Sequence, residues 1–216
     1  MAIRKTYPLT AAVLSLLAMV ATGCSGGEGE DDRPRVPDIA KKFCDSSLTP
    51  PATRAFEKLL AGKNVKEPTS SGKLTKAAHD VKQVPRDDLT ACEVMGYDSV
   101  RDGVDIRFGW SYGLVTPSRK YRDASFSVAD QAFSNGRLTY ILLKCSASVP
   151  KLDPDEKHYL VASLNGPDSD LPVAERRKLH ISILYPVLRK MAGIIGCKEA
   201  AALPATPSIK KTTAPK

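Results

Sequence analysis

The chain has 216 residues, of which 32 are basic and 24 acidic, and its formal net charge is +8 at pH 7. Basic and acidic side chains are interspersed without a run of five or six lysines or arginines, and only 6% of the residues are aromatic. This composition lacks the basic, aromatic-rich stretches typical of nucleic-acid-binding proteins, and the length suits one domain of roughly 150 residues with flexible ends.

The first 23 residues have the pattern of an export signal. Arg4 and Lys5 form a charged start, and the mostly apolar stretch at 9–20 suits a signal core but is shorter than the ~20 residues that span a bilayer. The small residues at 21–23, followed by Cys24, resemble the lipobox of bacterial lipoproteins, although Ala21 stands where leucine is usual. An ordinary secretory signal that leaves a free thiol is the alternative.

The lipobox resemblance implies that Cys24 carries a lipid. In lipoproteins this thiol receives a diacylglyceryl group before cleavage, so Cys24 would become the first of 193 mature residues. Paired acyl chains such as palmitate anchor firmly, because each buried methylene contributes ~0.8 kcal/mol. We therefore expect a lipid-anchored protein on the extracytoplasmic face of the cell membrane. Its formal charge of +6 without the signal suits a cationic surface that faces anionic membrane or wall polymers.

Four cysteines remain for disulfides once Cys24 is set aside. They are Cys44, Cys92, Cys145 and Cys197, and an even number in an exported chain predicts two disulfides. No C-x-x-C or nearby histidine pair supports a metal or redox site, so no cofactor is expected. Three pairings are open; we favour Cys44–Cys92 and Cys145–Cys197, because each would tie a helical segment to a strand near its own part of the chain.

Composition divides the mature chain into three parts. Residues 24–37 predict a flexible tether, because glycine, proline and mutually repelling acidic residues dominate them. A single domain is expected over 38–199. Residues 200–216 form a Pro/Lys/Thr tail with too little apolar surface to fold.

The first half of the domain predicts short helices. Residues 38–44 suit one helical turn, and Thr49 before two prolines suits the capped start of a helix that ends near Gly62. Apolar residues at helical spacing over 74–81 predict another helix, which Pro85 ends.

From Thr90 onward, apolar residues recur at every second position, a spacing that predicts strands. The segments at 90–96 and 104–110 are expected to form a hairpin whose alternate residues face the core. Asn135-Gly136 predicts a turn before a central strand at 138–145 that is apolar on both faces. A further strand is expected at 158–164, and 125–128 offers a short partner.

A long helix is predicted over 173–195, with Asp170 as its cap and Pro172 in its first turn. Pro186 lies inside it and should kink or split it. The order of elements indicates an α+β fold: an antiparallel sheet of about four strands with helices packed on one face.

Several local features resemble small lipoproteins of actinobacteria whose role is unassigned. They are the lipobox, the four-cysteine layout, Leu143-Lys144-Cys145, Ile195-Gly196-Cys197 and a proline three residues after Ala201. The resemblance implies the same architecture and transfers no functional residue.

Gly109-Trp110-Ser111-Tyr112-Gly113 matches the G-x-S-x-G turn that exposes a serine nucleophile in α/β hydrolases. That motif needs a helix after it, whereas Pro117 follows and the alternating β and α elements are missing. A hydrolase that used Ser111 would also require a base, either His158 or His180. Asp153 or Asp155 would have to orient that base. A strand end with two turn glycines is the expected structure.

Other candidate residues favour ordinary structural roles. Surface or hydrogen-bonded roles are expected for the three separate histidines, His79, His158 and His180. Two clusters of acidic residues lack the spacing of a calcium-binding loop, so we expect both to be solvated turns. They are Asp98, Asp102 and Asp105, and Asp153, Asp155 and Glu156. Trp110 and Tyr112 suit the core and its rim, and no phosphate-binding glycine loop occurs.

The sequence thus predicts a non-catalytic lipoprotein that binds a wall component, a small molecule or another envelope protein. One alternative is a hydrolase that uses Ser111. Another is a carrier with an apolar cavity between the sheet and the helix at 181–195, opened by a kink at Pro186.

Overall fold

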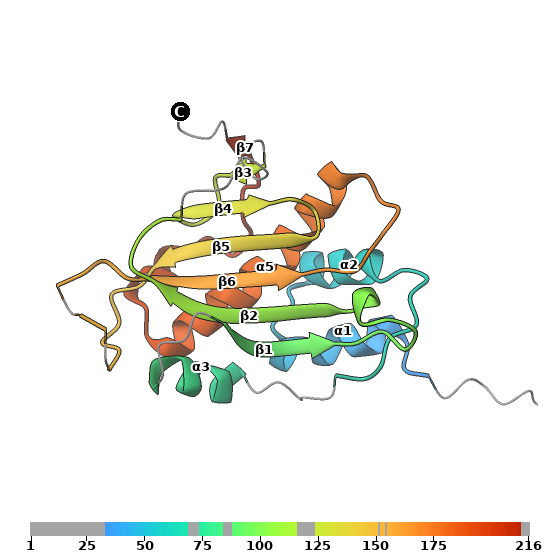
Figure 1. The fold of residues 1–216 in the computed structure, drawn as a ribbon, viewed down its shortest axis with the longest axis horizontal. Coiled ribbons are helices and arrows are strands. Elements are labelled where there is room, and N and C mark those ends of the chain that lie inside the picture. The colour runs from blue at the N-terminus through green and yellow to red at the C-terminus, as the bar shows by residue number, and fades with distance from the viewer. Residues whose placement is uncertain are drawn as a thin grey trace, which may run out of the picture. The chain divides into compact units, whose positions relative to one another are not determined.

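The computed structural model describes residues 33–68, 74–83, 88–115, 124–150, 152–153 and 155–212. The signal segment, Cys24 and the tether as far as residue 32 lie outside the described residues, as does Pro85. The described chain is an α+β domain in which the helices cover one face of an antiparallel sheet (Figure 1).

The helices follow the predicted segments closely, because each has an apolar stripe that the sheet can bury. They are α1 (Val36–Ser46), α2 (Pro50–Leu59), α3 (Leu74–Gln83) and α5 (Val173–Ile195), with short 3₁₀ helices η1 (Val100–Asp102) and η2 (Lys198–Ala202). Left-handed backbone at Cys44, Asp45 and Ser46 ends α1. There the Asp45 carboxylate accepts a hydrogen bond from the Leu74 amide at 2.7 Å, which satisfies a free donor at the start of α3.

The sheet has seven strands in the described residues, in the order β1-β2-β6-β5-β4-β3-β7. They are β1 (Leu89–Val94), β2 (Val104–Ser111), β3 (Ser125–Phe126), β4 (Gln131–Ser134), β5 (Leu138–Lys144), β6 (Tyr159–Asn165) and β7 (Lys211–Thr212). The prediction of about four strands is therefore wrong. The short partner predicted at 125–128 is present as β3, whereas β4 and β7 were not predicted, because strands of two to four residues are too short to show a period of two.

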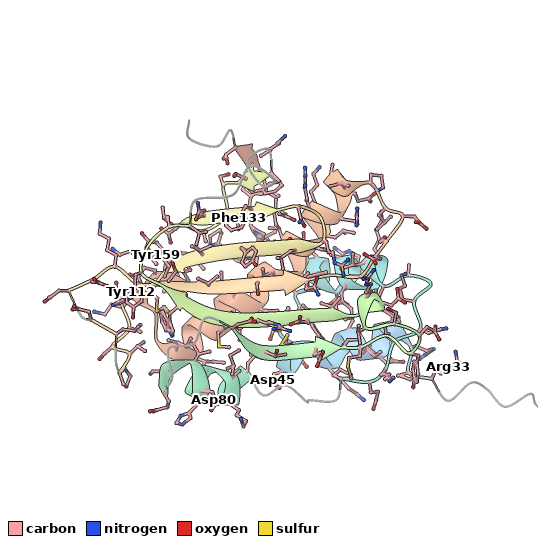
Figure 2. The ribbon with its side chains drawn as sticks, in the orientation of Figure 1. Arg33, Asp45, Asp80, Tyr112, Phe133 and Tyr159 are labelled. Atoms are coloured by element: carbon pink, nitrogen blue, oxygen red, sulfur yellow. A yellow bond between two sulfur atoms is a disulfide. The ribbon has the colours of Figure 1, made fainter. Side chains whose placement is uncertain are left out.

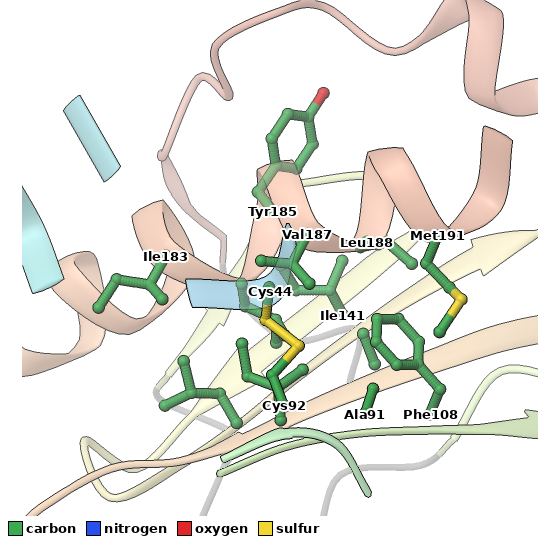
Figure 3. Close-up of a cluster of buried hydrophobic side chains, with 14 of the residues drawn as sticks. Cys44, Ala91, Cys92, Phe108, Ile141, Ile183, Tyr185, Val187, Leu188 and Met191 are labelled. Atoms are coloured by element: carbon green, nitrogen blue, oxygen red, sulfur yellow. A yellow bond between two sulfur atoms is a disulfide. The ribbon is translucent and has the colours of Figure 1, made fainter. Parts of the chain in front are cut away.

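The predicted hairpin is present as β1 and β2, and β6 lies between β2 and β5. Alternate residues of β2 point to the helices, among them Ile106, Phe108 and Trp110, which are buried. Figure 3 shows Leu188 and Met191 of α5 pointing toward the sheet, where Phe108 lies. The core therefore fills the layer between α5 and the sheet.

Helix α5 runs unbroken through Pro186, so the expected split does not occur. A proline removes one backbone hydrogen bond, and here both neighbours of Pro186, Tyr185 and Val187, are buried and hold the helix in place. Pro172, rather than Asp170, is the N-cap, and no side chain caps that end. Gly196 ends the helix with a φ of 92°, a conformation that glycine adopts without strain.

Two disulfides connect the layers in the favoured pairing. Cys44–Cys92 joins the end of α1 to β1, and Cys145–Cys197 joins the residue after β5 to the residue after Gly196. All four cysteines are buried, so each bond is part of the core as well as a covalent link.

The described C-terminal residues are ordered against the domain, unlike the unfolded tail predicted from residue 200. The Tyr185 hydroxyl donates a hydrogen bond to the Pro204 carbonyl at 2.8 Å, and Ile209 packs against the core. Strand β7 then pairs with β3. A few anchoring contacts of this kind hold a segment whose composition alone predicts no structure.

Candidate functional site

Register places several candidate residues at one end of the sheet. Ser111 of β2 lies opposite Tyr159 of β6, which lies opposite Lys144 of β5. Figure 2 accordingly shows Tyr112 and Tyr159 at the same end. We call the described residues 112–115, 145–150, 152–153 and 155–158 together the loop end of the sheet.

Ser111 is not arranged as a nucleophile in the described structure. Its hydroxyl donates a hydrogen bond to the Gly113 carbonyl at 2.7 Å, and no described histidine is bonded to it. Ser111 faces Tyr159, whereas the ring of Tyr112 contacts that of His158 at 5.3 Å between centroids. The Ser111 hydroxyl and the His158 ring therefore have different partners and do not bond to each other.

His158 is held by the loop that precedes it. Its Nε2 donates a hydrogen bond to the Asp153 carbonyl, because a carbonyl oxygen can only accept, and its Nδ1 is buried without a partner among the described residues. The Asp153 carboxylate accepts a hydrogen bond from the Asp155 amide at 2.9 Å. Asp153 and Asp155 therefore shape a turn, as the sequence predicts.

Three exposed apolar side chains follow β2, and one of them, Tyr112, contacts His158 of this loop. Tyr112, Leu114 and Val115 are 62%, 52% and 40% exposed. The Gln131 side chain fixes the segment, because it accepts from the Val115 amide at 3.0 Å and donates to the Val115 carbonyl at 2.8 Å. The segment thus reaches from β2 to β4 and presents its apolar side chains in a defined position.

A pocket of about 420 Å³ opens next to this segment. His158, which touches Tyr112, is part of its wall, and the wall carries charges of both signs. The lining comprises Lys144, Cys145, Ser146, Ala147, Ser148, Val149, Leu152, Asp153, Glu156, Lys157 and His158. Such a lining offers polar contacts beside an apolar patch.

The remaining candidates lie apart from the loop end. His79 is exposed on α3, and Trp110 donates from its indole Nε1 to the Val81 carbonyl at 3.0 Å, which makes it a core residue. Asp102 pairs with Lys63 at 2.7 Å, and Asp105 with Arg107 at 2.8 Å. The described part of the chain has no group of three histidine, cysteine, aspartate or glutamate side chains that could hold a metal ion.

His180 belongs to a buried network that joins three elements. Its Nδ1 lies 3.2 Å from the Thr139 hydroxyl, which donates to the Ser134 hydroxyl at 2.6 Å. All three residues are inaccessible to solvent. Burial, and then the nearby Arg176 charge, lower the pKa of His180 to about 4, so the ring is neutral at pH 7 and donates to Thr139.

Gly166 lies against the other side of this ring, and Gly166→Ala should lower the free energy of unfolding by about 2 kcal/mol. An added Cβ would stand 2.3 Å from His180 Nε2, and the buried ring has no room to retreat. Chemical denaturation measures the loss. Gly193→Ala is the matched control, because its Cβ would meet nothing within 4 Å; an equal loss in both variants would contradict this explanation.

Sequence reasoning missed the loop end as a unit. Leu114 and Val115 stand out only as apolar residues in a predicted loop, and their attachment to Gln131 depends on tertiary structure. Within the described residues, no helix has both the length and the apolar character needed to cross a bilayer. No protein-family model, curated protein or solved structure matches this chain in the comparisons.

Proposed function

We propose that this protein is a membrane-anchored, extracytoplasmic lipoprotein that acts as a non-catalytic interaction module of the cell envelope. The anchor rests on the lipobox-like sequence that ends at Cys24. The interaction surface is the loop end of the sheet, and its partner is another envelope protein.

The observation that carries the interaction is the exposed apolar group of Tyr112, Leu114 and Val115. Contiguous apolar side chains at a surface favour burial against a partner, whereas scattered ones need no explanation. The Gln131 contacts hold this group in place before binding, which reduces the entropy lost on association. The charged wall of the adjoining pocket supplies the polar rim that protein interfaces have.

Neither alternative function gains comparable support. The Ser111 hydroxyl is bonded to the Gly113 carbonyl and lacks a described base. The side chains between α5 and the sheet, including Leu188 and Met191, are fully buried. A pocket of about 390 Å³ touches Leu143 of β5 and Tyr185 of α5, but charged residues also line it, so it is not the apolar cavity that a carrier needs; they are Asp130, Lys144 and Glu199.

Photocrosslinking in cells of the source organism tests this proposal. A benzophenone amino acid at position 112 should yield one discrete protein adduct, whereas the same probe at Val100, which is 81% exposed on η1, should not. Labelled palmitate should be incorporated into the parent protein but not into the Cys24→Ser variant. The crosslinked adduct of that variant should also be weaker, because the protein is no longer anchored.

Two results would contradict the proposal. Equal adduct patterns from positions 112 and 100 would show that the loop end is ordinary surface. Lipid incorporation that persists in Cys24→Ser would place the anchor elsewhere. Thermal unfolding of each variant controls for loss of the fold.

A further inference from the structure

A second pocket, of about 590 Å³, opens between α5, η2 and the turn that leads into α2. We call it the basic pocket. Its lining comprises Ser47, Thr49, Pro186, Arg189, Lys190, Gly193, Gly196, Cys197, Lys198, Ala200, Ala201 and Ala205. The volume lies within the range of ~300–1,000 Å³ that is usual for small-molecule sites.

The lining contains three cationic side chains and no carboxylate. Among the described residues, no carboxylate pairs with Arg189 or Lys198. Lys190 donates to the backbone carbonyl of Asp45 at 2.5 Å, while the carboxylate of Asp45 is used by the Leu74 amide. The pocket therefore carries positive charge that the protein leaves uncompensated.

Cations elsewhere on the domain are of two kinds. Eight of them lie within 3.3 Å of a carboxylate, namely Arg35, Lys41, Lys42, Lys58, Lys63, Lys76, Arg107 and Arg137. Others, such as Arg54 and Lys178, have no carboxylate partner among the described residues but do not line this pocket, whereas Arg189, Lys190 and Lys198 line one hollow together. Unpaired cations that converge on one hollow raise the local concentration of anions, because the low-dielectric walls focus their field. The charge distribution thus favours an anionic ligand at this place.

The rest of the wall suits an oxyanion. Thr49 is the N-cap residue of α2, and its side chain makes no capping bond, so the hydroxyl is available to donate. The positive end of the α2 dipole lies at the same wall. Gly193 and Gly196 add no side chain, and a Cβ at either would meet nothing within 4 Å, so the floor between the cations is open.

We propose that the basic pocket binds a small phosphate ester. The guanidinium of Arg189 can hold two phosphate oxygens at once, and the ammonium groups of Lys190 and Lys198 balance a dianion. A ligand with a single carboxylate would neutralise only part of this positive charge. The site is separate from the proposed protein interface, since the basic pocket and the pocket at the loop end share no lining residue.

Two sources could supply this chemistry, a soluble phosphate ester or a phospholipid headgroup. The full chain carrying Cys24→Ser, which removes any anchor there, is titrated with glycerol 3-phosphate by calorimetry. In a second arm it is floated with vesicles of phosphatidylcholine, with or without phosphatidylglycerol. The test variant is Arg189→Gln/Lys198→Gln. The control is Arg54→Gln/Lys178→Gln, which removes the same charges from sites on α2 and α5 outside the pocket lining.

The test variant should weaken binding by about 10-fold or more, because it loses the charge-assisted hydrogen bonds of two cations, while the control should bind as the parent does. Binding of glycerol 3-phosphate would show that the pocket binds a soluble phosphate ester without a membrane. Binding only to phosphatidylglycerol vesicles identifies a lipid headgroup. Absence of binding in both arms, or an equal effect of the two variants, would overturn the proposal, provided that thermal unfolding shows both variants folded.

Discussion

Cys44→Ala/Cys92→Ala is expected to lower the free energy of unfolding by about 4 kcal/mol. The bond closes a loop across a sequence separation of 48 residues, and the loss of this restraint on the unfolded chain accounts for most of the expected value. Alanine is preferred to serine, because both sites are buried and a hydroxyl there would lack a partner.

Urea unfolding of the parent and the variant measures this loss, with the amplitude of the transition as a check on cooperativity. Cys145→Ala/Cys197→Ala is the comparison, since its bond spans a similar separation of 52 residues. Chain entropy alone predicts nearly equal losses. A loss below about 1 kcal/mol at Cys44–Cys92 would show that the reduced chain already restrains this region.

Acid should destabilise the domain between pH 6.5 and 4, and His180→Leu should remove most of that dependence. The pKa of His180 is lowered from 6.5 to about 4 in the fold, so the unfolded chain binds the proton more readily. The stability that the neutral ring confers is complete above pH 6.5 and is lost as the pH falls toward 4. The total is ~3 kcal/mol at ~1.36 kcal/mol per pKa unit.

Denaturant unfolding across this pH range tests the prediction, and His79→Leu, at an exposed site on α3, is the matched control. The window avoids Asp38 and Asp80, whose pKa values are lowered by hydrogen bonds from Lys41 and Lys76 and which therefore gain protons only in stronger acid. An acid response that survives in His180→Leu would assign the sensitivity to other groups.

The parts of the fold that could be predicted are those in which a local pattern repeats. Helix α5 spans 23 residues and β2 spans 8, so each is long enough for its apolar period to be recognised without tertiary context. The parity of the cysteines likewise limits the disulfides to a few pairings whatever the fold. By contrast, β7 forms only because residues 211–212 meet β3, about 85 residues earlier in the chain.

The candidate site was less predictable, because its properties depend on register and long-range contacts. Ser111 lies opposite Tyr159 and bonds to Gly113, whereas His158 bonds to the Asp153 carbonyl, and only the folded structure reveals these partners. The basic pocket draws residues from the α1–α2 turn, α5 and η2, and no spacing in the sequence connects them. The His180 network likewise joins β4, β5 and α5.

The pairing of β2 with β6 has a consequence for biosynthesis. Between these strands lie about fifty residues that include β3, β4 and β5, and the helix that covers their apolar face, α5, comes later still. A chain that emerges from the ribosome therefore exposes Phe108 and Ile141 until residue 195 has been synthesised. The layer between α5 and the sheet can form only once this last helix is present, so we expect the domain to fold after its synthesis rather than stepwise.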